Sequence, residues 1–170
     1  VDAAYPVTVD PSIGSWSFRS GQADAWLGHS LASAGDINND GFDDILVTAP
    51  YYDNDDTDEG RLWLFYGSAD GLGTEADWTF EPNQANAHLG SDGGDQHCGV
   101  AGNADFNGDG YNDLAVGAYA DDPNGSDSGA VFISPGSASG ILSSSTVTLN
   151  GSNSDDQYGY WGRMDGGDFD

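Results

Sequence analysis

An internal repeat constrains the fold of this chain more than any other feature. When the sequence is shifted by 69 positions, residues 35–71 align without a gap on residues 104–140. A second match, at an offset of 62, places residues 16–28 on 78–90, and the difference of seven corresponds to one insertion at residues 91–97. A third unit starts near residue 147 and reaches only the beginning of its own aspartate cluster. Repetition with such a period indicates stacked copies of one supersecondary unit.

Each unit contains four short apolar or β-branched runs separated by turn residues. In the first unit they are residues 31–34, 45–48, 62–66 and 78–80, and in the second 100–101, 114–116, 131–133 and 147–149. Continuous apolar runs such as "LWLFY" are typical of strands covered on both faces. A single four-stranded sheet cannot bury both of its faces, whereas stacked sheets can. The pattern therefore predicts an all-β fold of β-propeller blades, each with four antiparallel strands.

The length of the chain limits how many blades it can form. Closed propellers have about 4–8 blades, whereas 170 residues supply two complete repeats. We therefore expect a fragment or an incomplete propeller. The expected organisation is an N-terminal segment at residues 1–15, a first repeat at 16–77, a second repeat at 78–146 and the truncated start of a third at 147–170.

Each repeat carries a loop of the form D-x-N-x-D-G-x-x-D directly before a predicted strand. Oxygens at positions 1, 3 and 5 converge if the chain turns sharply after position 5, and glycine at position 6 permits that turn. A backbone carbonyl at position 7 and a carboxylate at position 9 complete an oxygen cage. The expected metal ligands are Asp36, Asn38, Asp40, the carbonyl of Phe42 and Asp44; Asp105, Asn107, Asp109, the carbonyl of Tyr111 and Asp113; and Asp168 and Asp170 of the third copy.

The oxygen-only ligand set favours Ca²⁺ over zinc or copper, and Mg²⁺ prefers a stricter octahedral geometry. An EF-hand is excluded because position 12 holds Val47 or Val116 instead of an acid, and because strands are predicted after the loops. The alternative is a pair of metal-free Asx-rich turns, since Asp, Asn and Gly favour turns without any ion. Several carboxylates in one such turn would repel each other.

Composition narrows the classes of partner. The 29 acids and 3 bases give a formal net charge of −26, which argues against nucleic acid and against anionic membrane surfaces. No apolar run approaches a membrane span, so direct membrane insertion is not expected. The acidic balance is compatible with cation binding, with secretion or with a salt-adapted organism. Cys98 is the only cysteine, which excludes an intrachain disulfide.

Other candidate sites have simpler explanations. His88, His97 and Cys98, with Asp92 and Asp95 between them, could form a transition-metal or thiol-active site, but packing at strand edges and a solvated loop is the favoured explanation. The acidic run at residues 51–60 could form a second, weaker cation site, although charge runs are usually exposed faces. Tyr51, Tyr52 and Trp161 could contribute to a carbohydrate or protein contact surface. We find no catalytic constellation or phosphate loop, and therefore expect that the segment is not an enzyme and has no catalytic residues.

The repeats resemble the FG-GAP repeats of integrin α-subunit β-propellers. The resemblance rests on Leu27-Gly28, the first aspartate loop and "VTAP" (residues 47–50), and on Leu89-Gly90, the second loop and "VGAY" (residues 116–119); Tyr158-Gly159 opens the third copy. It implies a seven-bladed propeller in which the loops bind Ca²⁺ as hairpins at one rim. The family also includes bacterial secreted proteins and one class of phospholipase, so the fold does not settle the activity.

These observations predict a calcium-binding propeller segment of an extracellular, secreted or cell-surface protein that acts in recognition or adhesion. The expected partner is an unidentified protein or carbohydrate ligand, and other chains could complete the propeller. One alternative is a structural subunit of a surface filament or multi-protein assembly. Another is the non-catalytic scaffold of a secreted enzyme.

Overall fold

The computed structural model describes residues 16–91 and 99–159, which form two four-stranded antiparallel sheets. The first sheet contains, in chain order, β1 (Leu31–Gly35), β2 (Asp44–Ala49), β3 (Arg61–Phe65) and β4 (Trp78–Phe80). The second contains β5 (Val100–Ala104), β6 (Asp113–Ala118), β7 (Ala130–Ser134) and β8 (Val147–Asn150), with a short 3-10 helix, η1 (Ser143–Ser145), before β8. The predicted all-β fold of four-stranded antiparallel units is confirmed.

The two sheets repeat each other in strand register as well as in sequence. Ile45 of β2 pairs with Phe65 of β3, and at the offset of 69 Leu114 of β6 pairs with Ser134 of β7. Both the β1–β2 and the β5–β6 pairings also contain one irregularity just before the aspartate loop. Each loop therefore starts from an equivalent backbone position in its sheet.

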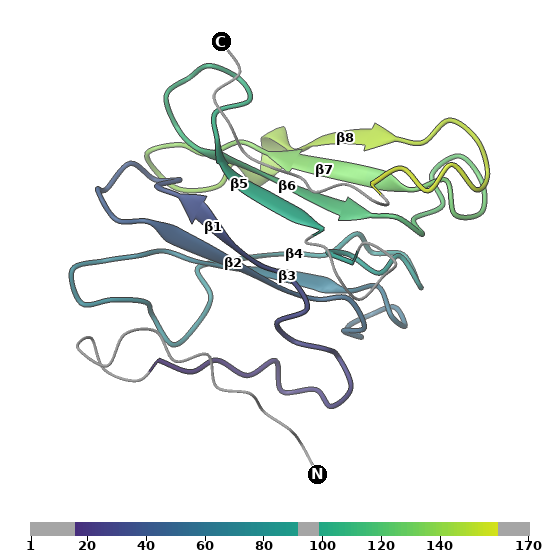
Figure 1. The fold of residues 1–170 in the computed structure, drawn as a ribbon, viewed down its shortest axis with the longest axis horizontal. Coiled ribbons are helices and arrows are strands. Elements are labelled where there is room, and N and C mark those ends of the chain that lie inside the picture. The colour runs from purple at the N-terminus through teal and green to yellow at the C-terminus, as the bar shows by residue number, and fades with distance from the viewer. Residues whose placement is uncertain (1–15, 92–98, 160–170) are drawn as a thin grey trace.

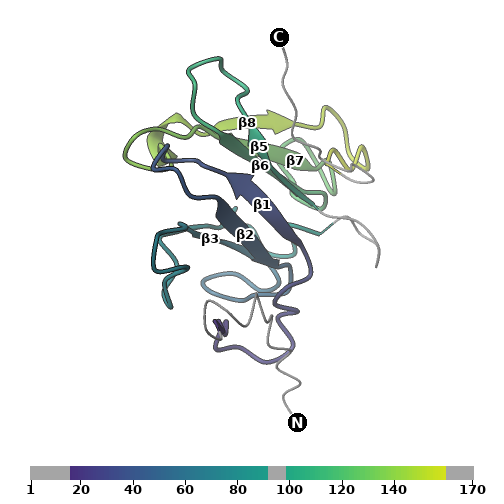
Figure 2. The ribbon, with the colours of Figure 1, turned by 60° about the vertical axis from the view of Figure 1, so that its left-hand side comes forward.

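The two sheets pack face to face, with β1 and β5 as neighbouring strands (Figures 1 and 2). The apolar cluster between the sheets includes Leu62 and Leu64 of β3, Leu114 of β6 and Phe132 of β7. Leu89, from the connection between the sheets, is fully buried in the same cluster. Burial of this apolar surface is the main force that holds the two units together.

The opposite face of the first sheet is also covered, as its continuous apolar strands predicted. Trp63 and Phe65 of β3 point away from the second sheet and pack against Trp16 and Phe18. The ring of Phe18 lies 5.5 Å from that of Trp63 and 4.9 Å from that of Phe65, in edge-to-face contacts. Both faces of the two central strands, β2 and β3, are therefore buried.

The outer face of the second sheet differs from its counterpart in the first. Val131 and Ile133 of β7 are only half-buried, and on β8 Val147 and Leu149 are 51% and 40% exposed. Strand pairing places Leu149 opposite Val131 and Val147 opposite Ile133, so the four side chains share one face. This apolar face corresponds to the face of the first sheet that the second sheet covers.

Candidate metal centre

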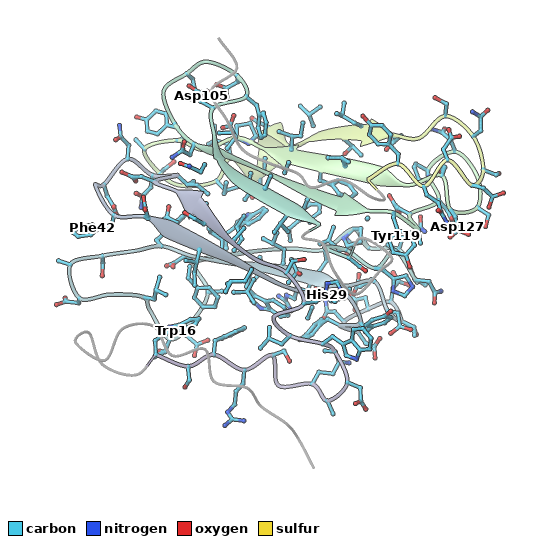
Figure 3. All side chains as sticks on the ribbon, in the orientation of Figure 1. Trp16, His29, Phe42, Asp105, Tyr119 and Asp127 are labelled. Atoms are coloured by element: carbon cyan, nitrogen blue, oxygen red, sulfur yellow. The ribbon has the colours of Figure 1, made fainter. Side chains whose placement is uncertain are left out.

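The two aspartate loops lie at the same end of the stacked sheets. We call the loop at residues 36–44 between β1 and β2 the first hairpin, and the loop at residues 105–113 between β5 and β6 the second hairpin. Figure 3 shows Phe42 and Asp105 at this end, whereas Tyr119 and Asp127 lie at the other. The fold therefore groups the two predicted ligand sets at one rim.

Hydrogen bonds within the first hairpin give it a defined shape. The Asp36 carboxylate accepts hydrogen bonds from the backbone N–H groups of Asp40 (2.9 Å) and Gly41 (2.8 Å). The side-chain oxygen of Asn38 also accepts from the Asp40 N–H, at 3.1 Å, and its amide donates to the Asp40 carboxylate at 3.0 Å. Asp40 in turn accepts from the N–H of Phe42 at 3.0 Å. Positions 1, 3 and 5 are thus held on the same side of one tight turn.

The second hairpin forms the corresponding bonds. Asp105 accepts from the N–H groups of Asp109 (3.1 Å) and Gly110 (2.8 Å), and Asn107 accepts from the Asp109 N–H at 2.8 Å. The Asn107 amide donates to Asp109 at 3.0 Å, and Asp109 accepts from the Tyr111 N–H at 3.0 Å. These N–H groups hold the pKa of the exposed Asp105 below its ordinary value, chiefly through Gly110. Two separate segments therefore fold into the same oxygen-lined turn.

Glycine at position 6 is required by the turn. Gly41 and Gly110 have φ values of +94° and +91°, in the region that side chains with a Cβ rarely adopt. Apart from the glycine and its two chain neighbours, no heavy atom lies within 4 Å of the place where a Cβ would be built on either residue, so backbone conformation, not crowding, selects glycine. This confirms the sharp turn that the sequence pattern predicts.

Position 9 contributes a buried carboxylate that has a structural role of its own. Asp44 is fully buried and accepts hydrogen bonds from the N–H of Ile37 (2.9 Å) and from the N–H of Gly67, after β3 (2.8 Å). Asp113 is bonded in the same way, by the N–H groups of Phe106 (2.8 Å) and Gly136 (2.9 Å). Position 9 therefore ties each hairpin to the end of the third strand of its sheet.

The surroundings of these carboxylates favour a cation. The pKa of Asp44 is raised to about 6: burial is the largest cause, the negative charges of Asp40 and Asp36 act in the same direction, and the two backbone hydrogen bonds oppose them. Burial also raises the pKa of Asp113, and the charges of Asp109 and Asp105 act in the same direction. A buried carboxylate that faces further carboxylates is favoured in its charged form when a positive ion lies among them.

The donor set fits a hard cation. In both hairpins the side chains at positions 1, 3, 5 and 9 are Asp or Asn. A carboxylate has about four lone-pair sites, so even Asp105, which accepts three N–H bonds, retains acceptor capacity. In the described ranges, no group of three or more His, Cys, Asp or Glu side chains is gathered closely enough to hold a metal ion. An ion would therefore need the Asn oxygen, the position-7 carbonyl and water in addition to the carboxylates.

One residue that the sequence pattern did not single out joins the two hairpins. The side-chain amide of Asn112, at position 8 of the second hairpin, donates to the backbone carbonyl of Asp36 at 3.4 Å. The equivalent residue of the first hairpin is Asp43. A carboxylate at position 112 could not donate this bond and would face the carbonyl oxygen of Asp36, which explains why an amide suits the second hairpin.

The remaining candidate residues fall into two groups. Asp168, Asp170, His97, Cys98 and Trp161 lie outside the described residues. His88 is described: its ring packs between those of Tyr51 and Tyr119, at 5.0 and 5.7 Å. Burial lowers the pKa of His88, which favours the neutral packing residue that the simpler explanation predicts. In the parts of the chain that the structure describes, no helix has the length and apolarity needed to cross a membrane.

Comparison with known proteins agrees with this architecture. The FG-GAP repeat family model matches residues 27–65 and 100–134, and each match includes one hairpin with the three strands around it. The chain is 38% identical over 98 residues to integrin alpha pat-2 of Caenorhabditis briggsae, covering 56% of this chain and 8% of that protein. It is 36% identical over 126 residues to integrin alpha-PS2 of Drosophila melanogaster, covering 71% and 8%. With human integrin alpha-6 it shares 35% identity over 132 residues, covering 76% and 10%. The matched region thus spans about a tenth or less of each relative.

Proposed function

The chain carries two FG-GAP repeats similar to those of integrin alpha subunits, and from this premise we propose that it is a calcium-binding β-propeller segment that acts in recognition or adhesion. Its place is outside the cell, on a secreted or cell-surface protein. Its partner is a protein or carbohydrate ligand. The propeller is the scaffold of that interaction and carries out no catalysis.

The observation that carries the calcium assignment is the duplicated hairpin. Two segments that are 69 residues apart form equivalent hydrogen bonds, and each ends in a buried Asp that faces other acids. Ca²⁺ accepts six to eight oxygen ligands in flexible geometry, which suits a turn with carboxylate, amide and carbonyl oxygens. Asp36, Asn38, Asp40, the carbonyl of Phe42 and Asp44 would hold the first ion. Asp105, Asn107, Asp109, the carbonyl of Tyr111 and Asp113 would hold the second, and Asp168 and Asp170 would belong to a third.

The ion would neutralise the repulsion between carboxylates and fix the hairpin on its sheet. Because Asp44 and Asp113 also bind the N–H groups after β3 and β7, each site would connect three strands of its sheet. Extracellular modules bind Ca²⁺ with dissociation constants of roughly 10⁻⁴–10⁻³ M, so millimolar calcium fills them. At 2 mM Ca²⁺, which is about 2–20 times such a Kd, each ion stabilises the native state by roughly 0.7–1.8 kcal/mol.

A second candidate function, as a unit of a larger assembly, is favoured by the outer face of the second sheet. Val131, Ile133, Val147 and Leu149 form an apolar face whose counterpart in the first sheet is covered by the neighbouring sheet. This face would accept another blade, either from the same protein or from another chain. Sedimentation of the chain at increasing concentration separates these cases, because only pairing between chains depends on concentration.

The experiment that tests the calcium assignment is thermal unfolding in calcium and in chelator. We expect 2 mM Ca²⁺ to raise the Tm of the parent well above its value in EDTA, and the double variant Asp40→Asn/Asp109→Asn to lose most of this increase. Each substitution removes one ligand charge with little change in volume, and a tenfold loss of affinity corresponds to about 1.4 kcal/mol.

Asp43→Asn is the matched control. It removes the same charge from the first hairpin, but position 43 is not a ligand, and the equivalent residue of the second hairpin is already Asn112. The control should therefore retain the full response to calcium. The assignment is wrong if the parent melts at the same temperature in calcium and in chelator, or if Asp43→Asn lowers the response as much as Asp40→Asn.

A further inference from the structure

The loop between β2 and β3 contains a carboxylate that neither hairpin explains. We call residues 50–60 the acidic loop; it includes Asp53, Asp55, Asp56, Asp58 and Glu59. It follows β2, whereas the first hairpin precedes it, so the length of β2, about 20 Å for six residues, separates the two. Asp53, Asp55, Asp56 and Asp58 are at least partly exposed, but Glu59 is 0% exposed.

Only one oxygen of the Glu59 carboxylate has a partner among the described residues. Oε1 accepts hydrogen bonds from the backbone N–H groups of Asn54 (3.1 Å) and Asp56 (3.5 Å), which places the carboxylate inside the acidic loop. Oε2 is buried and has no hydrogen-bond partner in the part of the chain that the structure describes. A buried carboxylate oxygen without a partner is costly, and an ion or water is the usual reason that such an atom is retained.

The second repeat shows that the loop does not need a carboxylate at this position. The equivalent residue is Ser128, which is also fully buried. Its hydroxyl accepts from the N–H of Asn124 at 3.2 Å and donates to the carbonyl of Asp121 at 3.4 Å. A neutral hydroxyl therefore organises the equivalent turn, and the second oxygen of Glu59 is not required for loop structure.

Among the described residues, the basic group next to Glu59 along the chain, Arg61, is paired with another acid. Glu81, just after β4, accepts from the side-chain amide of Asn54 at 3.2 Å and forms an ion pair with Arg61, with Nε and Oε1 3.3 Å apart. Burial raises the pKa of Glu81 and the charge of Arg61 lowers it, while the charges of Glu59 and Asp55 raise it. Asn54 thus bridges two carboxylates, Glu59 through its backbone and Glu81 through its side chain.

Arg61 is already engaged by its other neighbours. Its Nη1 donates to the Tyr52 hydroxyl at 3.5 Å and its Nη2 to the Thr79 hydroxyl at 3.2 Å. Its guanidinium carbon also lies 5.3 Å from the ring centroid of Tyr52 and 5.6 Å from that of Trp63. This one arginine is paired with Glu81, on which the charges of Glu59 and Asp55 also act, so the cluster has an excess of negative charge.

We propose that the acidic loop holds a further cation, of the hard, oxygen-preferring class represented by Ca²⁺, with Glu59 Oε2 as its buried anchor and Glu81 as its second carboxylate. No three acidic side chains are gathered closely here, so backbone carbonyls of the loop and water supply the remaining ligands. The site is independent of the two hairpins, and the second repeat lacks it because Ser128 replaces Glu59.

The test uses the full chain with the hairpin sites disabled, so that the two proposals are measured separately. In the Asp40→Asn/Asp109→Asn background, Tb³⁺ serves as a luminescent probe for calcium sites, and Tyr52 and Trp63, whose rings contact Arg61, are the aromatic residues that would sensitise it. We expect saturable Tb³⁺ luminescence that Ca²⁺ displaces, and at least a tenfold loss of affinity on adding Glu59→Ser. The charge-matched control Asp58→Asn, in the same loop, should change the affinity by no more than about twofold.

Thermal unfolding separates loss of the ion from loss of the fold. In EDTA, Glu59→Ser should melt at or above the temperature of the parent, because it removes a buried, unpaired oxygen and introduces the residue that the second repeat uses. In calcium, its increase in Tm should be smaller than that of the parent. Equal Ca²⁺ stoichiometry for the parent and Glu59→Ser would overturn the proposal and assign the unpaired oxygen to bound water. If Glu59→Ser abolishes all calcium binding while the hairpin variants do not affect it, the hairpin assignment fails and this one stands.

Discussion

At the scale of single residues, the aspartates of one hairpin have different roles. Asp40 is exposed and forms hydrogen bonds only within its own hairpin. Asp44 is fully buried and accepts hydrogen bonds from the N–H of Ile37, which follows β1, and from the N–H of Gly67, which follows β3. The repeated pattern predicted both as ligands but could not distinguish them, because sequence spacing does not show which carboxylate is buried. The Asp at position 9 therefore holds the hairpin on its sheet even without a bound ion.

This difference predicts that the Asp44 and Asp40 variants differ in stability in chelator. Asp44→Asn should lower the free energy of unfolding by about 1–3 kcal/mol in EDTA at pH 7.5, since one N–H group then faces an amide donor instead of an acceptor. Asp40→Asn should leave that free energy nearly unchanged in EDTA, because the site at position 40 is exposed. Urea denaturation of both variants in EDTA measures the two values. If they are equally stable, position 9 has no role beyond that of a ligand.

At the scale of elements, the apolar runs predicted each strand in residues 16–91 and 99–159, but they did not predict every strand end. The predicted run at residues 78–80 coincides with β4, but the run at 100–101 falls short of β5, which extends to Ala104. Gly102 and Asn103 are not apolar, and the strand continues because Ala104 pairs with Asp113 of β6. The contact of Asn112 with Asp36 and the burial of Glu59 were likewise not predictable, since they depend on how separate segments meet in space.

Two glycines at equivalent positions of the repeats have different surroundings, because only one of them lies beside Tyr66 of the other repeat. Gly71 and Gly140 have φ values of +91° and +88°, so alanine is strained at both. A Cβ on Gly71 would meet nothing within 4 Å, whereas on Gly140 it would overlap the Tyr66 hydroxyl. That hydroxyl accepts from the N–H of Ile141 at 3.0 Å and so links the two units.

We therefore expect Gly140→Ala to destabilise the chain by more than Gly71→Ala, with the excess, on the order of 1–3 kcal/mol, reflecting the clash and the lost link. Because the backbone strain is matched, the difference between the two free energies of unfolding isolates the contact with Tyr66. Equal losses in the two variants would show that the contact contributes nothing to the packing of the repeats.

At the scale of the whole molecule, a net charge of −26 opposes folding independently of any specific site. Monovalent salt screens this repulsion over a Debye length of about 10 Å at 0.1 M, whereas calcium at millimolar concentration adds little ionic strength. We expect NaCl between 0.05 and 0.5 M to raise the Tm gradually in EDTA, and to the same extent in the parent and in Asp40→Asn/Asp109→Asn. Calcium at 2 mM should raise the Tm of the parent by clearly more than that of the double variant, because the ions bound at the hairpins distinguish the two proteins. Melting curves across the NaCl and calcium series separate ionic screening from specific calcium binding. If 0.5 M NaCl reproduces the whole calcium response, the hairpins do not bind calcium specifically and the response is screening of surface acids.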